Sequence, residues 1–439
     1  MTTAVDRTSK QQHQRVAADV VDEWLARNPE TIPPPISRWD VGRMDVFNED
    51  RWQPIFRDMR AQAPINKVTG GVNGDYWNVS TYEAIQYVEA HPEIYSSSHL
   101  LGGISIVDPP AGMAHNVSLP MFIAMDRPDH TARRRTIVNA FTPAEMARRS
   151  AEIRERTERL LDTLPIGEQF DWVSRVSVEL TTSMLAILFD FPREDSHLIS
   201  YWSDWITTIA VGQVPEILAG RLNASQQMSE YFTRLWNERK NAKTPGSDLL
   251  SLMLNSDSLN AMSPQEFMGT MMLLVVGGND TTRNTMSGLV LALDQFPEQR
   301  AKLEANPALA ATTVAETIRY VSPVLHMRRT ATVDTELFGH QIRQGDKVIL
   351  WYGSANFDDS KFDQPEQYRV DRDNAGRHLA FGFGIHRCIG ARLAEMQLRI
   401  LIEEILARRL RVHVTGDLIR NGGPFMHALR KLEVSVERY

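Results

Sequence analysis

A single cysteine lies in the most distinctive stretch of the sequence. Residues 381–390 read Phe-Gly-Phe-Gly-Ile-His-Arg-Cys-Ile-Gly, and Cys388 is the only cysteine among 439 residues. Three glycines in this decapeptide allow the backbone to pass close to a flat partner. A helix is predicted to follow Cys388, and the N–H groups at its start would stabilise a thiolate. A lone cysteine forms neither an intramolecular disulfide nor a thiolate cluster, so its chemistry is that of a nucleophile or of a single sulfur ligand to a metal.

A second group of residues with chemical potential lies inside a predicted long helix. Residues 263–266 read Ser-Pro-Gln-Glu, which has the form of a capping box with proline at the first helical position. No stop signal follows before Phe296-Pro297, so the helix is predicted to span roughly 32 residues, or about 48 Å. Within it, residues 277–282 read Gly-Gly-Asn-Asp-Thr-Thr. Two adjacent glycines cost about 1 kcal/mol each in a helix, so we expect them to leave room for a ligand, with a helix–helix crossing as the alternative.

Together these motifs resemble those of the cytochrome P-450 family, the haem-thiolate monooxygenases. The family signature Phe-Gly-x-Gly-x-His-x-Cys-x-Gly matches residues 381–390 at every fixed position. The resemblance implies that Cys388 ligates the iron of haem b, with Phe381 and Gly382 beside the cofactor. A thiolate ligand donates electron density to the iron and favours cleavage of the O–O bond. It also implies that Asp280 and Thr281 relay protons during dioxygen activation, as general acid–base chemistry requires.

The resemblance further implies residues that hold the two haem propionates. His130 and Arg134 are four residues apart, which places them on one face of a predicted helix. By resemblance they bind propionate together with Arg329 and His386, and Arg328 is the alternative to Arg329. Propionates that are partly buried need such cations or strong donors.

A charged pair three residues apart is implied to have a structural role. Glu316 and Arg319 lie on one helical face between the two motifs described above. By resemblance this pair holds the side of the fold that carries the cysteine loop. The family often adds a third arm, an arginine, where this sequence has Gln367, and Arg372 is the alternative residue for that arm.

The elements that must position these residues are mainly helical. One large domain of the cytochrome P-450 type is expected at residues 46–439, mainly α with small β-sheets, preceded by an N-terminal arm at residues 1–45. Spacing of apolar residues predicts the helices, and short alternating runs predict the strands. The predicted helices are 133–140, 144–164, 172–189, 197–211, 226–243 and 389–410, and the predicted strands are 76–79, 327–333, 341–343, 347–351, 411–414 and 432–436.

Composition and charge restrict the class of protein. The apolar content of 42% excludes a disordered chain, and a net charge of −7 argues against a nucleic-acid binder. Residues 1–27 lack the apolar centre of a signal peptide or membrane anchor, and residues 267–276 are too short to span a bilayer. A cytoplasmic protein without a membrane anchor is therefore expected. A local basic face could still steer an acidic ferredoxin to the haem, and its candidates are Arg133, Arg135, Arg387 and Arg392.

The expected activity is insertion of one oxygen atom from O2 into a C–H bond of a small apolar substrate. Electrons are expected from NAD(P)H through a separate ferredoxin and ferredoxin reductase. Residues 276–284 and 326–331 resemble the bacterial branch that hydroxylates terminal carbons of medium-chain alkanes and fatty acids. Steroid side-chain or branched-lipid hydroxylation is the alternative, and a non-catalytic haem-thiolate protein or gas sensor is the alternative of another class. Candidate substrate contacts are Leu273, Leu274, Gly277, Leu325, Met327 and Phe425.

Overall fold

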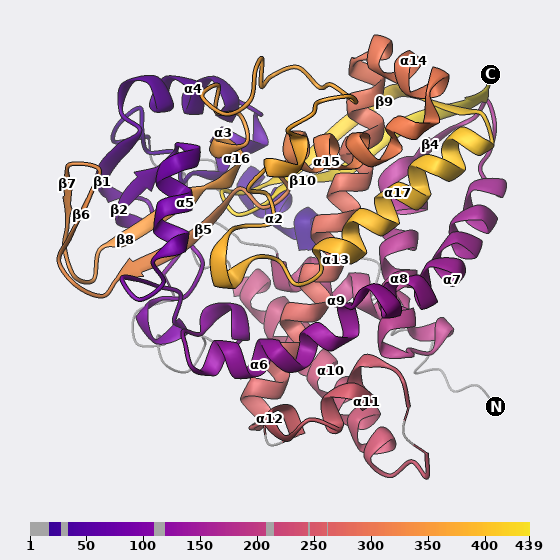
Figure 1. Cartoon of the computed structure of the whole chain (residues 1–439), viewed down its shortest axis with the longest axis horizontal. Coiled ribbons are helices and arrows are strands. Elements are labelled where there is room, and N and C mark those ends of the chain that lie inside the picture. The colour runs from indigo at the N-terminus through magenta and orange to yellow at the C-terminus, as the bar shows by residue number, and fades with distance from the viewer. Residues whose placement is uncertain (1–16, 28–33, 109–118, 208–214, 245, 261) are drawn as a thin grey trace.

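The structure, a computed structural model, describes residues 17–27, 34–108, 119–207, 215–244, 246–260 and 262–439. A large helical region adjoins a smaller region built around a β-sheet (Figure 1). The fold is therefore mainly α with small sheets, as expected. Its helices are α2 (Ala17–Arg27), α3 (Met44–Asn48), α4 (Trp52–Gln62), α5 (Tyr82–Ala90), α6 (Asp129–Ile137), α7 (Pro143–Asp162), α8 (Glu179–Phe189), α9 (His197–Thr207), α10 (Pro215–Lys240), α11 (Leu249–Leu254), α12 (Asp257–Asn260), α13 (Pro264–Gln295), α14 (Pro297–Ala305), α15 (Ala310–Val321), α16 (Tyr352–Ala355) and α17 (Ala391–Ala407).

Three sheets accompany the helices. The largest has the strand order β1-β2-β8-β5-β3, in which β2 and β8 run parallel and the other neighbours run antiparallel. A second sheet has the order β4-β10-β9, and β6 and β7 form a separate hairpin. The strands are β1 (Ile65–Gly71), β2 (Gly74–Val79), β3 (Tyr95–Ser96), β4 (Gln169–Asp171), β5 (His326–Ala331), β6 (Thr335–Leu337), β7 (His340–Ile342), β8 (Lys347–Trp351), β9 (Leu410–Gly422) and β10 (His427–Arg438).

Helix α13 runs through the centre of the molecule (Figure 1). The predicted capping box forms at its start, where the Ser263 hydroxyl accepts from the Glu266 N–H and the Glu266 carboxylate accepts from the Ser263 N–H. The helix has the predicted 32 residues and ends at Gln295, before Phe296-Pro297. It is apolar on most sides because other helices surround it.

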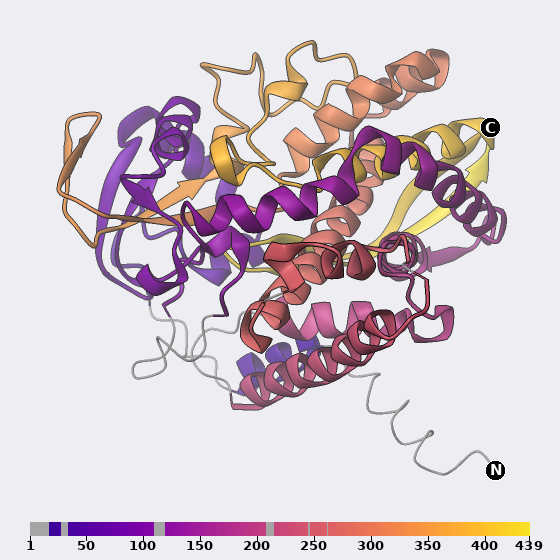
Figure 2. The ribbon, with the colours of Figure 1, turned by 60° about the horizontal axis from the view of Figure 1, so that its bottom comes forward.

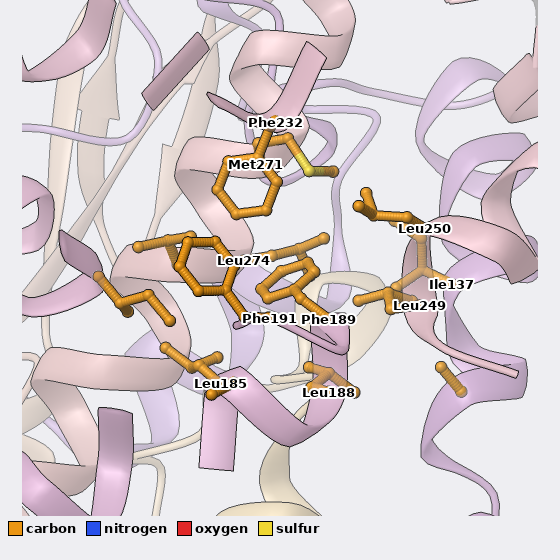
Figure 3. Packing of buried hydrophobic residues seen from close by; sticks show 14 of the residues in the cluster. Ile137, Leu185, Leu188, Phe189, Phe191, Phe232, Leu249, Leu250, Met271 and Leu274 are labelled. Carbon is orange, nitrogen blue, oxygen red and sulfur yellow. The ribbon is translucent and has the colours of Figure 1, made fainter. Parts of the chain in front are cut away.

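The core around α13 is formed by side chains from several helices. Phe189 and Phe191 meet Phe232 of α10 in edge and tilted ring contacts, with centroids 5.1 and 5.9 Å apart. Leu274 of α13 and Leu185 of α8 belong to the same cluster (Figure 3). Burial of such side chains stabilises a fold by roughly 1.5–3 kcal/mol each, so this cluster holds α13 firmly against its neighbours.

Besides shifts of a few residues elsewhere, such as the start of α6 at Asp129 where 133 is expected, two predicted helices differ clearly from the structure. The helix expected at 172–189 begins as a π-helical segment over Val173–Val178 and becomes regular in α8. The helix expected at 226–243 starts much earlier, at Pro215. Gly220 explains the second difference: a Cβ there would lie 2.0 Å from the Trp205 ring of α9, so close helix packing outweighs the low helix propensity of glycine. Residues 208–211 of the helix expected at 197–211 lie outside the described residues.

The described part of the expected N-terminal arm is the helix α2. Figure 2 shows α2 beside α10, and α2 contacts α9 as well. Val20 and Val21 form a small apolar cluster with Met44 and Ile217. Among the described helices, none combines the length and the apolar character needed to cross a membrane.

Candidate active site

The cysteine loop folds back on itself before α17. The Cys388 N–H donates to the Phe381 carbonyl and the Gly382 N–H donates to the Leu379 carbonyl, both at 2.8 Å. Gly382 and Gly384 have φ values of +67° and +64°, which favour glycine. At Gly384 an added Cβ would also lie 2.5 Å from the Glu89 carbonyl oxygen. The glycines of the motif are therefore required by the backbone path and by its close contact with α5.

A cavity of about 1200 Å³ opens in front of Cys388. Its walls come from the cysteine loop, α13, α10 and the start of β5, and the Cys388 side chain faces into it. Burial within the protein raises the pKa of the thiol, while the Gly390 N–H and the charges of Arg134 and Arg387 act in the opposite direction. A thiol with these neighbours would release its proton to solvent when a metal ion binds to its sulfur in the cavity.

Two histidines stand side by side at the edge of this cavity. The rings of His130 and His386 have centroids 4.3 Å apart, and no hydrogen bond reaches any of their four nitrogens within the described residues. Burial and the nearby Arg134 and Arg127 lower the pKa of His130 to about 4. Burial and the nearby Arg329 lower the pKa of His386 to about 2. Both rings are therefore neutral at pH 7, and each retains an N–H that can donate to an anion.

These groups fit a haem. One sulfur donor lies in the cavity, and the unpaired imidazole nitrogens suit the two propionate carboxylates of the cofactor. Arg134 and Arg329 line the same cavity, so all five predicted metal and propionate ligands are brought together: Cys388, His386, His130, Arg134 and Arg329. Phe381 and Gly382 line it too. Arg328 does not line the cavity and donates to the carboxylate of Asp108, which leaves Arg329 as the candidate.

Glu89 is a functional residue that the sequence analysis missed. Its buried carboxylate pairs with Arg329 at 3.0 Å and accepts from the Tyr352 hydroxyl at 2.6 Å and from the Phe383 N–H at 2.7 Å. Burial raises the pKa of Glu89, and these three partners oppose that shift. Glu89 thus ties Arg329 to the cysteine loop. No local motif signals this role, because the three partners come from three segments that are distant from Glu89 in the sequence.

The two glycines of α13 have different neighbours. A Cβ on Gly278 would lie 2.7 Å from the Leu185 side chain of α8, whereas a Cβ on Gly277 would meet nothing within 4 Å. Gly278 therefore allows close helix packing, and Gly277 leaves open space in the cavity wall. The helix continues without a break through both residues. The expected space for a ligand is thus found at Gly277, and the alternative, a close helix–helix crossing, is found at Gly278.

Thr281 and Asp280 point in different directions. Thr281 lines the cavity, and its hydroxyl donates to the Gly277 carbonyl at 2.9 Å. Asp280 is fully buried and pairs with Arg283 at 3.0 Å, and Arg283 pairs in turn with Asp204 of α9 at 2.7 Å. The second carboxylate oxygen of Asp280 has no hydrogen-bond partner among the described residues. This oxygen is therefore available to accept a hydrogen bond from a water molecule.

The predicted substrate contacts are largely brought together. Leu273, Leu274, Gly277, Met327 and Phe425 line the cavity. The prediction that Leu325 contacts the substrate is wrong. Leu325 is fully buried in the core cluster that includes Trp52 and Trp351. Neighbours in an extended chain face opposite sides, and it is Val324 that lines the cavity.

Glu316 is the centre of a buried ion network. Its carboxylate accepts from Arg319 at 2.7 and 2.8 Å and from the Arg372 Nε at 3.0 and 3.1 Å. Arg372 thus occupies the third arm, and Gln367 contributes its backbone carbonyl to both arginines. Arg319 also donates to the Asn356 carbonyl at 2.7 Å, and the Asn356 side chain accepts from the Leu379 N–H at 2.7 Å. The network therefore connects to the cysteine loop through two further hydrogen bonds.

Protonation of His326 is expected to weaken the fold at low pH. His326 is fully buried, its Nε2 accepts from the Ile106 N–H at 3.1 Å, and its Nδ1 faces the Pro424 carbonyl. Burial lowers the pKa of His326 to about 4, below the value near 6.5 of an unfolded chain. The unfolded state then binds more protons between these values, so stability is lost as pH falls from about 6.5 to about 4.

The test compares wild type with His326→Gln by denaturant unfolding across this range. The stability advantage of wild type is expected to shrink by up to about 3 kcal/mol toward pH 4. An advantage that stays constant with pH would contradict the assignment of His326 as a buried neutral residue.

Comparisons with known proteins agree with this geometry. A family model described as Cytochrome P450 matches residues 121–421. The solved structure of Cytochrome P450-153 from Novosphingobium aromaticivorans has a TM-score of 0.87 and 56% identity, covering 91% of this chain and 100% of that one. A linalool 8-monooxygenase of Pseudomonas putida is 34% identical over 91% of this chain and 99% of its own length. A methyl-branched lipid omega-hydroxylase of Mycobacterium tuberculosis is 32% identical, over 92% and 96% of the two chains.

Proposed function

The chain belongs to the cytochrome P450 family of haem-thiolate monooxygenases, and from this premise we propose that it hydroxylates the terminal carbon of linear, medium-chain alkanes or fatty acids. The observation that carries the proposal is the cavity in front of Cys388, whose inner walls are apolar. Leu273 and Leu274 stand on one wall and Phe425 on another, so the site favours a hydrocarbon over a polar substrate.

Selective hydroxylation of a terminal carbon requires a particular shape of the cavity walls. A terminal methyl C–H bond is stronger than an internal one, so the walls must keep internal carbons away from the reacting position. Gly277 leaves a gap in the α13 wall beside Thr281, and the larger Leu273 and Leu274 lie one turn before it. A gap bordered by bulky side chains suits a narrow chain end. The omega-hydroxylase among the relatives, which by its name acts at a chain end, supports the same selectivity.

Bound haem supplies the oxygen-activating chemistry, and the residues of this chain position it. Cys388 would hold the iron, and His130, His386, Arg134 and Arg329 would hold the propionates. The apolar walls exclude water and orient the substrate. We propose that electrons come from NAD(P)H through a ferredoxin reductase and a ferredoxin. The ferredoxin would dock where Arg135, Arg387 and Arg392 are exposed, whereas Arg133 already pairs with Glu266.

The proposed function is tested by the position of the hydroxyl group in the product. The enzyme is supplied with ferredoxin, reductase and NAD(P)H and incubated with octane, dodecane or dodecanoic acid. The main product is expected to carry the hydroxyl on the terminal carbon. Predominant hydroxylation at internal carbons, or no turnover of any linear chain, would contradict the proposal.

Hydroxylation of a branched lipid or a steroid side chain is the second candidate. The name of the mycobacterial relative and the cavity volume of about 1200 Å³ favour it. The two candidates are separated by titrating linear alkanes, a methyl-branched fatty acid and cholestenone into the ferric enzyme and following its spin state. Tighter binding and faster turnover of the linear chains would support the first candidate, and the opposite order would support the second.

Replacing Thr281 by alanine is expected to uncouple electron use from product formation. We propose that the Thr281 hydroxyl, which faces the cavity, holds the last proton donor, and that Asp280 supplies protons through its free oxygen. The yield of product per NAD(P)H consumed is expected to fall about tenfold, because the last proton donor loses the hydroxyl that positions it. Thr270→Ala is the matched control: its hydroxyl bonds to the Glu266 carbonyl in the same helix, and its side chain is buried outside the cavity wall. Equal yields in both variants would exclude the role of Thr281.

A further inference from the structure

Six charged residues line the cavity, and five of them have a partner. Arg43 pairs with Asp45 at 3.0 Å, Glu89 with Arg329 at 3.0 Å, and Asp108 with Lys347 at 2.6 Å. Arg134 lies beside Cys388 and donates to the Arg387 carbonyl. The sixth is Arg221, and no hydrogen bond or ion pair reaches its guanidinium from any residue that the structure describes.

The position of Arg221 is determined by helix packing. Arg221 lies on α10, which packs against α2, α9 and α13. Gly220, the preceding residue, faces the Trp205 ring so closely that a side chain would not fit. This contact sets the rotation of α10 about its axis. Leu218, Arg221 and Ser225 are spaced three and four residues apart and all line the cavity, so one face of the helix forms this wall.

An unpaired guanidinium in such a place calls for an anion. Burial lowers the pKa of Arg221, yet a guanidinium keeps its charge at neutral pH. A half-buried charge without a partner loses part of its hydration without compensation, and the planar guanidinium fork matches a carboxylate with two parallel hydrogen bonds. The haem propionates are not the expected anionic partner of Arg221. Their expected position lies near the cysteine loop, where four other residues already surround it: His130, His386, Arg134 and Arg329.

We propose that Arg221 binds the carboxylate of a linear fatty acid whose far end lies before Cys388. The inference rests on the proposed terminal hydroxylation and makes it more specific, since it selects fatty acids over alkanes. Arg221 belongs to the α10 wall and Cys388 to the loop before α17. An acid held at Arg221 extends its hydrocarbon tail along the apolar walls and presents its methyl end to the site. Arg221 is then a specificity-determining residue.

The test measures binding to the ferric holoenzyme through the change in its spin state. The ligands are dodecanoate and its methyl ester, which differ in charge and share the same chain. Arg221→Gln is expected to weaken dodecanoate binding about 10–100-fold, the effect of one lost hydrogen-bonded charge, and to leave the ester within about threefold. Arg221→Lys keeps the cation and is expected to recover part of the affinity. Arg234→Gln is the matched control on the same helix, where the arginine is exposed, lies 3.9 Å from Glu238 and stacks over the Tyr231 ring outside the cavity.

The outcomes separate this inference from the proposed function. Equal weakening of acid and ester, or an unchanged affinity for dodecanoate in Arg221→Gln, would overturn the role of Arg221. Loss of selectivity for the acid, with the control unchanged, would support it. The position of the hydroxyl in the dodecane product is measured separately on wild type. A terminal product from dodecane together with unchanged acid binding would retain the proposed function and reject the inference.

An optimum in chain length provides a second readout. An acid held at both ends has one best length, whereas an alkane can slide along the walls. Across acids from octanoate to hexadecanoate, wild type is expected to show a sharp optimum in affinity, and Arg221→Gln is expected to flatten it. An optimum of the same sharpness in both proteins would count against a carboxylate anchor at Arg221.

Discussion

Replacing Cys388 by alanine is expected to reduce product formation to the level without enzyme. Cys388 is the only thiol of the chain and the sulfur donor of the cavity, so no other cysteine can take its place. Its thiolate supplies the electron density that favours O–O cleavage. The measurement is product formed per haem, because the variant is also expected to hold less haem than wild type.

The fold of the same variant is expected to survive. The Cys388 side chain faces the cavity and belongs to none of the apolar clusters formed by the described residues, so the apoprotein is expected to lose less than about 1 kcal/mol of stability. Normal turnover by a folded Cys388→Ala protein would contradict the role of the sulfur. A collapse of the apoprotein would show instead that Cys388 is needed for packing.

Replacing Glu316 by glutamine is expected to cost about 3–5 kcal/mol of stability, because two buried guanidinium groups lose their shared counter-ion. Glu316, Arg319 and Arg372 are all buried, and Glu316 also accepts from the Arg369 N–H at 2.9 Å. Since the network connects through Asn356 to Leu379, the cysteine loop is expected to loosen and haem to dissociate faster. Unfolding curves and the rate of haem loss measure the two effects.

Glu366→Gln is the matched control for this prediction. Glu366 precedes Arg369 with the same spacing that separates Glu316 from Arg319, but its side chain is exposed. Its replacement is expected to change stability by less than about 0.5 kcal/mol. If Glu316→Gln and Glu366→Gln both lose less than about 0.5 kcal/mol of stability, the buried network does not hold the cysteine loop.

Local signals in the sequence are sufficient to predict the bounds of several helices and strands. The Ser263 capping box and the Phe296-Pro297 stop define α13 because both act within one helical turn. Strand β8 has the predicted bounds, since a short apolar run flanked by a turn is read locally. The strand pair that the sequence predicts at 411–414 and 432–436 is too short, because β9 and β10 continue past their apolar parts as a paired hairpin.

The features that the sequence does not predict depend on contacts between distant segments. Glu89 has no motif, and its role arises only when α5 meets β5 and the cysteine loop. Arg221 is one arginine among many in the sequence, and only the packing of Gly220 on Trp205 turns it to the cavity. The sequence predicts Leu325 as a substrate contact from its place after Glu316 and Arg319, whereas the alternation of an extended chain places it in the core. Such features follow from tertiary packing and leave no periodic signal.

The spectrum of the wild-type protein is the most direct test of the account. The purified protein, loaded with haem, is reduced and treated with carbon monoxide. If Cys388 ligates the iron as a thiolate in the cavity described above, the Soret band shifts to the red, and Cys388→Ala loses the shift. An unshifted Soret band in the folded wild-type protein would contradict the haem-thiolate site on which every other proposal depends.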